Sequence, residues 1–139
     1  MTFQEDWDNF YSKVTDVAQT LKLYPISRTP EELRLGMPLH QEITQPAGMF
    51  SAPSLFGLAD LSGTWLAMQH VPEGTFPLAV SSSINLLTNR KEGDAISVSR
   101  LVRAGRTIVV TDTEIISSID DAVLAKIICT YSVPAPRSK

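Results

Sequence analysis

Residues 51–69 read SAPSLFGLADLSGTWLAMQ, and apolar side chains run almost all the way round a helix built from this stretch. A helix that is apolar on every side is buried in the interior of a protein. Ser51 is suited to cap its first turn, and Pro53 is tolerated because first-turn amides have no partner inside a helix. Asp60 is the only ionisable side chain of the stretch. A buried carboxylate costs free energy unless it is paired, hydrogen-bonded or protonated, so Asp60 has either a structural partner or a chemical role.

Downstream of this helix, apolar residues recur with a period of two, which predicts β-strands. Four long segments rich in Val, Ile and Thr are separated by NRKEGD, AGR and SIDD, all of which favour turns. Long strands joined by tight connections form an antiparallel meander, and the apolar helix is expected to lie on one face of it. The expected strands span residues 78–87, 95–103, 107–117 and 122–133.

Upstream of the central helix, the chain begins with an amphipathic helical pattern. Thr2 and Glu5 have the spacing of a capping box, and apolar residues recur at intervals of three and four as far as Leu21. We expect this additional N-terminal helix to occupy residues 1–24 and to end before Pro25.

The stretch between the two helices lacks a clear period. Residues 24–30 contain two prolines and are expected to form a connector. An irregular extended segment is expected for residues 31–43, with Gly36 and Pro38 marking a bend or an edge. A turn at residues 45–48 then leads into the central helix.

Composition indicates one domain, because 139 residues of ordinary apolar and charged content are enough to bury a core. The net charge of −3 gives no footprint for nucleic acid. A single cysteine, Cys129, excludes an intrachain disulfide and the spacing of a zinc site, so we expect no metal. The acidic N-terminus differs from a secretory signal, and glycines, a proline and Asp60 dilute the longest apolar stretch. We expect a single cytoplasmic domain over residues 1–139, without a membrane partner.

The order of elements and several motifs resemble a known fold family. A strand, a long buried helix and four antiparallel strands are the order of the hotdog fold, an α+β fold in which an antiparallel sheet wraps around the helix. QPAGMFSAPSLFGLAD (residues 45–60) is similar to a stretch of the phenylacetate-pathway branch of hotdog acyl-CoA thioesterases. That stretch reads Asn-Pro-x-Gly-x-x-His-Gly-Gly, with an Asp or Glu nine residues after the His. The matching positions are Pro46, Gly48, Leu58, Ala59 and Asp60.

Further along, residues 81–87 (SSSINLL) resemble the next strand of the family. RKEGD and RAGRTIVV resemble the hairpin after it. The resemblance therefore covers residues 32–134, which we expect to form the hotdog core.

The resemblance implies roles for individual residues. Asp60 takes the position of the catalytic carboxylate, which acts as nucleophile or as general base toward water. The backbone N–H of Ala52 takes the position of the donor that polarises the thioester carbonyl, and Gln45 and Thr64 take those of assisting groups. The structural alternative is an Asp60 carboxylate satisfied by Ser54, Thr64 or a backbone amide. The remaining candidates, expected to contact substrate, are Ser51, Phe56, Ser83, Asn85, Arg90, Lys91, Arg103 and Arg106.

Five of the 12 basic residues fall between residues 90 and 106. In an acidic protein this concentration is suited to the phosphates of CoA, although the same residues also balance acidic neighbours. We therefore expect CoA as part of the substrate and no other cofactor. The identity of the acyl group depends on pocket shape, to which Phe56, Trp65 and Met68 are expected to contribute.

Ser51-Ala52-Pro53 stands where the family has His-Gly-Gly. The Ala52 amide survives as a donor, but Pro53 supplies no N–H, and Ala52 carries a Cβ where glycine admits the thioester closely. Loss of one oxyanion contact commonly costs about 10²–10³ in rate. The alternative to a thioester hydrolase is therefore a non-catalytic hotdog module that binds an acyl or CoA-like ligand or serves in oligomerisation. A dehydratase is disfavoured because no Asp-x-x-x-x-His arrangement occurs.

Ala52 and Asp60 are eight residues apart, about 12 Å along a helix. Attack on a carbonyl requires reacting atoms about 3–3.5 Å apart, so donor and carboxylate of one chain cannot act on the same carbonyl. A catalytic Asp60 requires a second copy whose helix lies antiparallel, in a dimer or a dimer of dimers. Gly57, Ala59 and Gly63 are small enough to admit a neighbouring helix.

Overall fold

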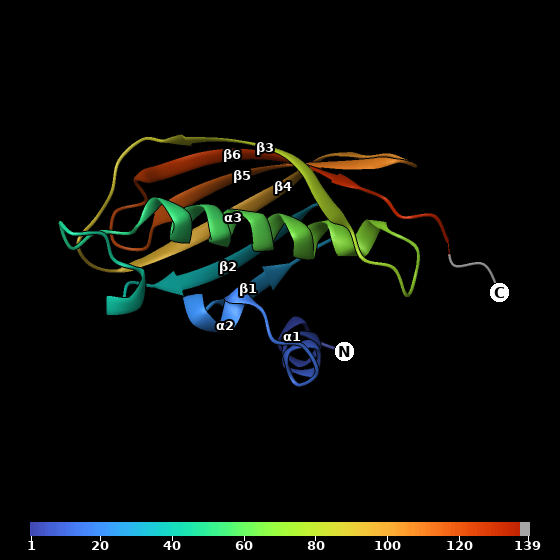
Figure 1. The fold of residues 1–139 in the computed structure, drawn as a ribbon, viewed down its shortest axis with the longest axis horizontal. Coiled ribbons are helices and arrows are strands. Elements are labelled where there is room, and N and C mark those ends of the chain that lie inside the picture. Colours follow the sequence, from blue (N-terminus) through green and yellow to red (C-terminus); the bar gives the residue numbers. More distant parts are fainter. Residues whose placement is uncertain (137–139) are drawn as a thin grey trace.

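The computed structural model describes residues 1–136, which form one antiparallel sheet curved around a long helix (Figure 1). The strands follow the order β1-β2-β4-β5-β6-β3. The predicted α+β architecture is confirmed. The helices are α1 (Phe3–Tyr11), α2 (Val17–Leu21) and α3 (Ala52–Ala67), with short 3-10 helices η1 (Gln41–Ile43) and η2 (Met68–His70). The strands are β1 (Tyr24–Arg28), β2 (Glu32–Pro38), β3 (Leu78–Leu86), β4 (Asp94–Ala104), β5 (Ile108–Ser117) and β6 (Val123–Ser132).

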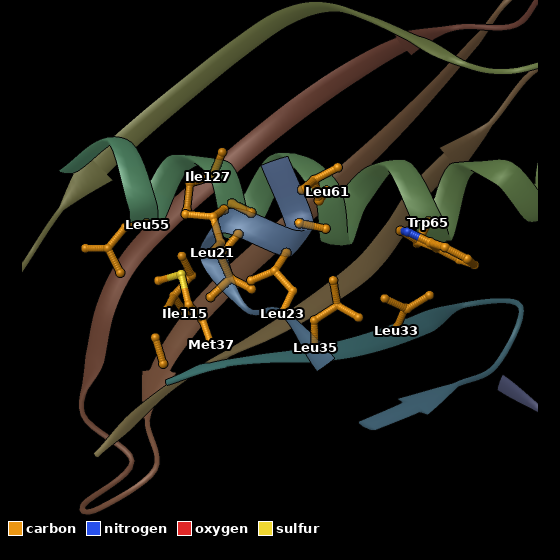
Figure 2. Packing of buried hydrophobic residues seen from close by; sticks show 14 of the residues in the cluster. Leu21, Leu23, Leu33, Leu35, Met37, Leu55, Leu61, Trp65, Ile115 and Ile127 are labelled. Carbon is orange, nitrogen blue, oxygen red and sulfur yellow. The ribbon is translucent and has the colours of Figure 1, made fainter. Parts of the chain in front are cut away.

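The core lies between α3 and the concave face of the sheet. Alternate residues of a strand point to the same face, and in β2 these are the fully buried Leu33, Leu35 and Met37. Figure 2 shows them in one layer with side chains of α3, β5 and β6, including Leu55 and Ile127. Within residues 1–136, no helix, α3 included, combines the length and the hydropathy needed to cross a membrane.

A chain of four buried hydroxyls crosses this apolar layer. The Oγ of Ser62, on α3, lies 2.7 Å from the Ser99 Oγ and 2.8 Å from the Ser97 Oγ of β4. Ser99 continues to Thr113 of β5 over 2.6 Å. Buried hydroxyls cost free energy when they lose their partners. The network therefore resists sliding of α3 along the sheet and holds the residues on that helix in place.

The predicted single helix over residues 1–24 is wrong, because the chain forms two short helices there. α1 ends at Tyr11, and α2 begins after Asp16. Asp16 caps α2 and forms a reciprocal capping box with Gln19. A second cap in the middle of the apolar pattern starts a new helix in a new direction, which leaves Val14 exposed.

α1 packs through aromatic rings on the C-terminal half of α3. The predicted capping box of Thr2 and Glu5 is present at its start. The rings of Trp7 and Phe10 lie 4.9 and 5.1 Å from that of Trp65, measured between centroids. Trp65, which was expected to shape the acyl pocket, is therefore occupied in holding α1 to the core.

The connector predicted for residues 24–30 is also wrong, because β1 forms there at the edge of the sheet. Pro25 is tolerated because an edge strand uses only one side for hydrogen bonds, and a bulge follows it. The segment predicted as irregular contains the regular strand β2, which lies between β1 and β4. Gly36 marks no bend; a Cβ at this position would overlap the ring of Tyr24.

The last four strands do not form the predicted meander. β4, β5 and β6 pair in sequence, but β3 pairs with β6 and occupies the outer edge of the sheet. The connection at residues 87–93 therefore crosses the sheet at the end where α3 begins (Figure 1). α3 carries the chain from β2 to the opposite edge, and β4 returns to pair with β2. This return encloses the helix within the curved sheet.

Candidate active site

A cavity of about 280 Å³ opens beside the first turn of α3. Ser51 caps this helix by accepting a hydrogen bond from the Ser54 N–H at 3.3 Å. The Ala52 N–H takes part in no hydrogen bond among residues 1–136, as is usual for first-turn amides. The cavity therefore contains a free backbone donor at the positive end of a helix dipole. Its lining residues are Gln45, Phe50, Ala52, Leu55, Leu86, Thr88 and Asn89.

Asp60 lies about two turns further along α3 and is half-buried. Within the described chain its carboxylate has no hydrogen-bond or ion-pair partner, and neither oxygen is completely shielded from solvent. Burial raises the pKa of this carboxyl above its ordinary value. The backbone carbonyl of Asp60, in contrast, accepts hydrogen bonds from the Thr64 hydroxyl at 2.7 Å and the Tyr131 hydroxyl at 2.8 Å. Two hydrogen bonds therefore fix the backbone of Asp60, while its carboxylate remains available to contact another molecule.

The side chains considered as structural partners of Asp60 are used elsewhere. Ser54 donates its hydroxyl to the Ser51 carbonyl at 2.7 Å. Thr64 donates to the carbonyl of Asp60 and not to its carboxylate. A carboxylate that is partly desolvated and unpaired is typical of a functional position, because a purely structural one would be satisfied.

The exposed Ala52 and Phe56 and the half-buried Asp60 form a stripe along the first half of α3. They are spaced four residues apart and so lie on one face of the helix. The rise of a helix separates Ala52 from Asp60 by about 12 Å. The side chains of Ala52 and Asp60 thus lie on one side of the helix, whereas the Ala52 N–H points along the helix axis toward its N-terminus. Donor and carboxylate are too far apart within one chain to act on one carbonyl.

The small residues of α3 lie against other elements of the same chain, and the expectation that they admit a neighbouring helix stays a prediction. Ala59 is fully buried. A Cβ on Gly63 would overlap the Tyr131 hydroxyl, and a Cβ on Gly57 would come within 2.9 Å of Leu21. These small residues let the chain's own β6 and α2 approach the helix closely.

Gln45 lies at the rim of the cavity. Its Oε1 accepts a hydrogen bond from the Ala47 N–H in the same loop. Its Nε2 has no partner among residues 1–136, which leaves an amide donor beside the cavity. Gln45 and Ala52 are therefore brought together, whereas Thr64 lies beside Asp60.

Ser83 and Asn85 lie on the face of β3 that points away from α3. Residues opposite each other in a sheet share a face. Ser83 pairs with Ile128, which is exposed, and Asn85 pairs with Lys126. The structure therefore does not bring these two side chains to the cavity within one chain.

Two of the five clustered basic residues are engaged in ion pairs. The Arg90 guanidinium donates to Asp120 from Nε at 3.1 Å and from Nη2 at 3.0 Å. Arg100 lies between Glu32 and Glu114, at 3.5 and 3.6 Å. Their charges are therefore balanced within the chain.

The other three basic residues have no ion pair in the described chain, but they do not form one patch. Lys91 precedes β4, whereas Arg103 lies near the other end of this strand and Arg106 just after it. The 11 residues of this strand separate the two groups by roughly 35 Å. No group of three or more His, Cys, Asp or Glu side chains in residues 1–136 is arranged to hold a metal ion.

Sequence reasoning missed two residues of this region, Asn89 and Tyr131. Asn89 lines the cavity and bonds to Phe50, 39 residues away. Tyr131 bonds to the backbone of Asp60, 71 residues away. No local spacing signals either contact, because each depends on how distant segments pair.

The raised pKa of Asp60 predicts how stability varies with pH. The native state holds the Asp60 proton more tightly than the unfolded state, so the contribution of this residue to stability is lost as pH rises through its native pKa. Asp60→Asn removes the cost of burying a charge. We expect the variant to melt at a higher temperature than the wild type at pH 7, and the difference to shrink at acidic pH, where Asp60 is protonated in both states. Thermal unfolding monitored by circular dichroism at several pH values tests this; a less stable Asp60→Asn at pH 7 would contradict it.

Comparison with protein-family models gives no match for this sequence, and comparison with curated proteins gives none either. Solved structures, in contrast, match most of the chain. A thioesterase from Haemophilus influenzae has a TM-score of 0.86 and 17% sequence identity, covering 95% of this chain and 90% of that one. A phenylacetic acid degradation-related protein from Ralstonia eutropha has a TM-score of 0.81 and 19% identity, covering 95% and 100%. A Staphylococcus aureus thioesterase has a TM-score of 0.83 and 14% identity, covering 87% and 100%.

At such low identity these likenesses concern the fold. They agree with the strand order and with the long helix enclosed by the sheet. The chain is therefore a hotdog-fold protein, as its motifs predicted.

Proposed function

We propose that this protein hydrolyses the thioester bond of an acyl-CoA or a related thioester, with Asp60 as the catalytic carboxylate. The observation that carries the proposal is the half-buried Asp60 carboxylate, which has no partner among residues 1–136, about two turns along α3 from an Ala52 N–H that also has none there. A half-buried carboxylate without a partner retains its reactivity toward a water molecule or a carbonyl carbon.

Similar solved proteins support the choice of residues. The H. influenzae and S. aureus neighbours are described as thioesterases. The S. aureus protein was crystallised with a Gln→Ala and with a Glu→Ala substitution fifteen residues apart, the same separation as that between Gln45 and Asp60.

In the proposed reaction, the thioester carbonyl lies at the Ala52 N–H of one chain and beside Asp60 of a second copy. Asp60 takes a proton from water while the water oxygen bonds to the carbonyl carbon, or it attacks that carbon itself and water then hydrolyses the acyl-enzyme. The Ala52 N–H donates to the developing oxyanion. The C–S bond breaks, and its electron pair leaves with the CoA thiolate. Gln45 Nε2 orients the water, and Thr64 holds the backbone of Asp60.

The second copy is proposed to join along β3, which is an unprotected edge strand. β3 has nine residues without a charge or a proline, and Leu78 and Val80 are each 61% exposed. Such edges pair with another strand unless they are blocked. The opposite edge, β1, is shorter and carries Pro25 and a bulge. Antiparallel pairing of two β3 strands about a two-fold axis brings two antiparallel α3 helices together on one side of a continuous sheet.

A non-catalytic module that binds an acyl or CoA-like ligand is the second candidate. The observation that favours it is the start of α3, where Pro53 has no N–H and Ala52 adds a Cβ at the cavity. One oxyanion donor then remains, and the rate is expected to suffer accordingly. Binding of CoA esters without any turnover would support this candidate.

The function is tested by thiol release from a panel of short-chain, aromatic and long-chain acyl-CoAs. We expect hydrolysis of at least one class by the wild-type protein. Absence of turnover across the panel at high enzyme concentration would contradict the proposal. Isothermal titration with the same compounds separates an inactive binder from a protein with no affinity for CoA esters.

Lys91, Arg103 and Arg106 are proposed to contact the CoA phosphates, with Lys91 nearest in sequence to the cavity residue Asn89. Because Lys91 has no ion pair within residues 1–136, its charge is available to a phosphate. We expect Lys91→Ala to raise KM for a CoA thioester several-fold, with kcat unchanged. The KM for a pantetheine thioester, which lacks the nucleotide phosphates, should not change. Equal effects on both substrates would contradict a phosphate contact.

A cytoplasmic location stays a prediction.

A further inference from the structure

Asn89 joins the connection between β3 and β4 to the segment that leads into α3. Its Oδ1 accepts a hydrogen bond from the Phe50 N–H at 3.1 Å, and its Nδ2 donates to the Phe50 carbonyl at 2.8 Å. Both peptide groups that flank Phe50 are therefore held by one side chain. Phe50 itself is almost fully buried. Ala52, with its free N–H, follows two residues later.

Asn89 is itself held in place by Arg90. The Arg90 N–H donates to Asn89 Oδ1 at 2.9 Å, so both acceptor positions of this oxygen are used. The Arg90 Nη1 donates to the Asn89 carbonyl at 2.7 Å. The other side of the guanidinium binds Asp120, in the turn between β5 and β6. A continuous series of contacts thus runs from this turn to the start of α3.

The ion pair at the far end of the series is favourable. Hydrogen bonds from Arg90 and from the Ala122 N–H lower the pKa of the Asp120 carboxyl, so it stays ionised under ordinary conditions. The two loops are also joined by hydrogen bonds between Asp94 and Ser118 in both directions. The connection that carries Asn89 is therefore anchored to the sheet.

Position matters at the start of α3 because, in the described part of the chain, the Ala52 N–H is the one first-turn amide without a hydrogen bond. An oxyanion donor acts at about 2.7–3.1 Å from the developing charge, and a displacement of about 1 Å costs on the order of 10²-fold in rate. Pro53 has no N–H to share that task. The loop at residues 45–49 before Phe50 is largely exposed and provides little packing of its own.

We propose that Asn89 is a positioning residue that sets the location of the Ala52 N–H at the cavity. This inference rests on the proposed function for its effect on rate, but not for its effect on structure. Because Asn89 Oδ1 and Nδ2 bind Phe50, Asn89 acts through the backbone. Its loss is expected to change kcat more than KM.

The test compares Asn89→Ala and Asn89→Asp with wild type and with Asn9→Ala, a matched control on the exposed face of α1. We expect Asn89→Ala to lower kcat about 10- to 100-fold with KM within about two-fold, because the donor is displaced and not removed. Asn89→Asp keeps an acceptor for the Phe50 N–H but loses the donor to the Phe50 carbonyl and adds a negative charge beside the oxyanion. Its kcat should fall at least as far. Asn9→Ala should behave as wild type.

Amide hydrogen exchange, measured by NMR, provides a second test that does not depend on thioester turnover. The Phe50 amide should exchange faster in Asn89→Ala but stay protected in Asn89→Asp. Both variants should remain folded, with a lower melting temperature for Asn89→Ala because two hydrogen bonds to Phe50 are lost. The proposal would be overturned by an unchanged kcat in Asn89→Ala, whether or not KM rises. It would also be overturned by unaltered exchange of the Phe50 amide in Asn89→Ala, or by unfolding of both variants. If the wild type cleaves no thioester, the proposed function fails, while the exchange measurement still decides whether Asn89 holds this segment.

Discussion

Asp60→Asn is expected to lower kcat for thioester hydrolysis by about 10²–10⁴-fold, the range associated with loss of a general base. The amide has nearly the same shape as the carboxylate, and no partner among residues 1–136 is lost with the charge. The fall in rate therefore reports chemistry and not misfolding. Thiol release under saturating substrate measures it, and the melting temperature of the same sample verifies that the variant is folded.

The pH dependence of kcat/KM for the wild-type protein provides a second test of the role of Asp60. Asp60 acts in its ionised form, and burial raises its pKa, so kcat/KM should fall on the acidic side at a pH above the ordinary range of an aspartate. If kcat/KM instead falls only at the ordinary pKa of an aspartate, the ionisation that activity requires belongs to a group other than Asp60.

Asp112 offers a matched control for Asp60. It is also a half-buried aspartate with an unpartnered carboxylate oxygen, but it lies on β5, whose alternate residues Thr111 and Thr113 face the core. The Asp112 side chain therefore points to the outer face of the sheet, away from α3. Asp112→Asn should retain full activity. If Asp60→Asn hydrolyses thioesters as fast as the wild type does, Asp60 is not part of the mechanism.

Val80→Lys is expected to convert the proposed dimer into a monomer and to abolish hydrolysis with it. Val80 lies on the edge strand β3, and a lysine on an edge strand opposes pairing with another strand because the interface would have to accommodate its charge. Neither Ala52 nor Asp60 is altered, but each site loses one of them when the chains separate. Sedimentation velocity and thiol release on the same samples should change together.

Val102→Lys is the control for this substitution. Val102 is 62% exposed and Val80 is 61% exposed, so the two changes are matched in chemistry and exposure, but Val102 lies on β4 near its hairpin with β5. Val102→Lys should remain dimeric and active. A wild-type protein that is monomeric at assay concentration and still hydrolyses thioesters would contradict the shared site.

The sequence was sufficient for the elements whose burial follows from local pattern. Residues 51–69 are apolar on every side, which requires a buried helix, and α3 with η2 covers residues 52–70. The strands that follow were predicted to within a residue at each end. The same reasoning failed for residues 12–16, where Asp16 caps a second helix inside a pattern that reads as continuous.

The site was predicted only where it depends on α3 itself. The spacing of Ala52 and Asp60 on one helix follows from the sequence, and so does the need for a second chain if both are catalytic. Whether the Asp60 carboxylate has a partner was decided by the tertiary structure, which directs Thr64 and Tyr131 to its backbone carbonyl.

Periodicity reports which face of a segment is buried, but not which distant segment covers it. The position of β3 at the outer edge, the two hydrogen bonds of Asn89 to Phe50, and the contact of Gly36 with Tyr24 all join parts of the chain that no local pattern links. The sequence by itself determined a buried helix, its lone carboxylate and the strands around it. The tertiary structure decided that this carboxylate has no partner among residues 1–136, because side chains from distant segments come within hydrogen-bond distance only when the sheet closes around the helix.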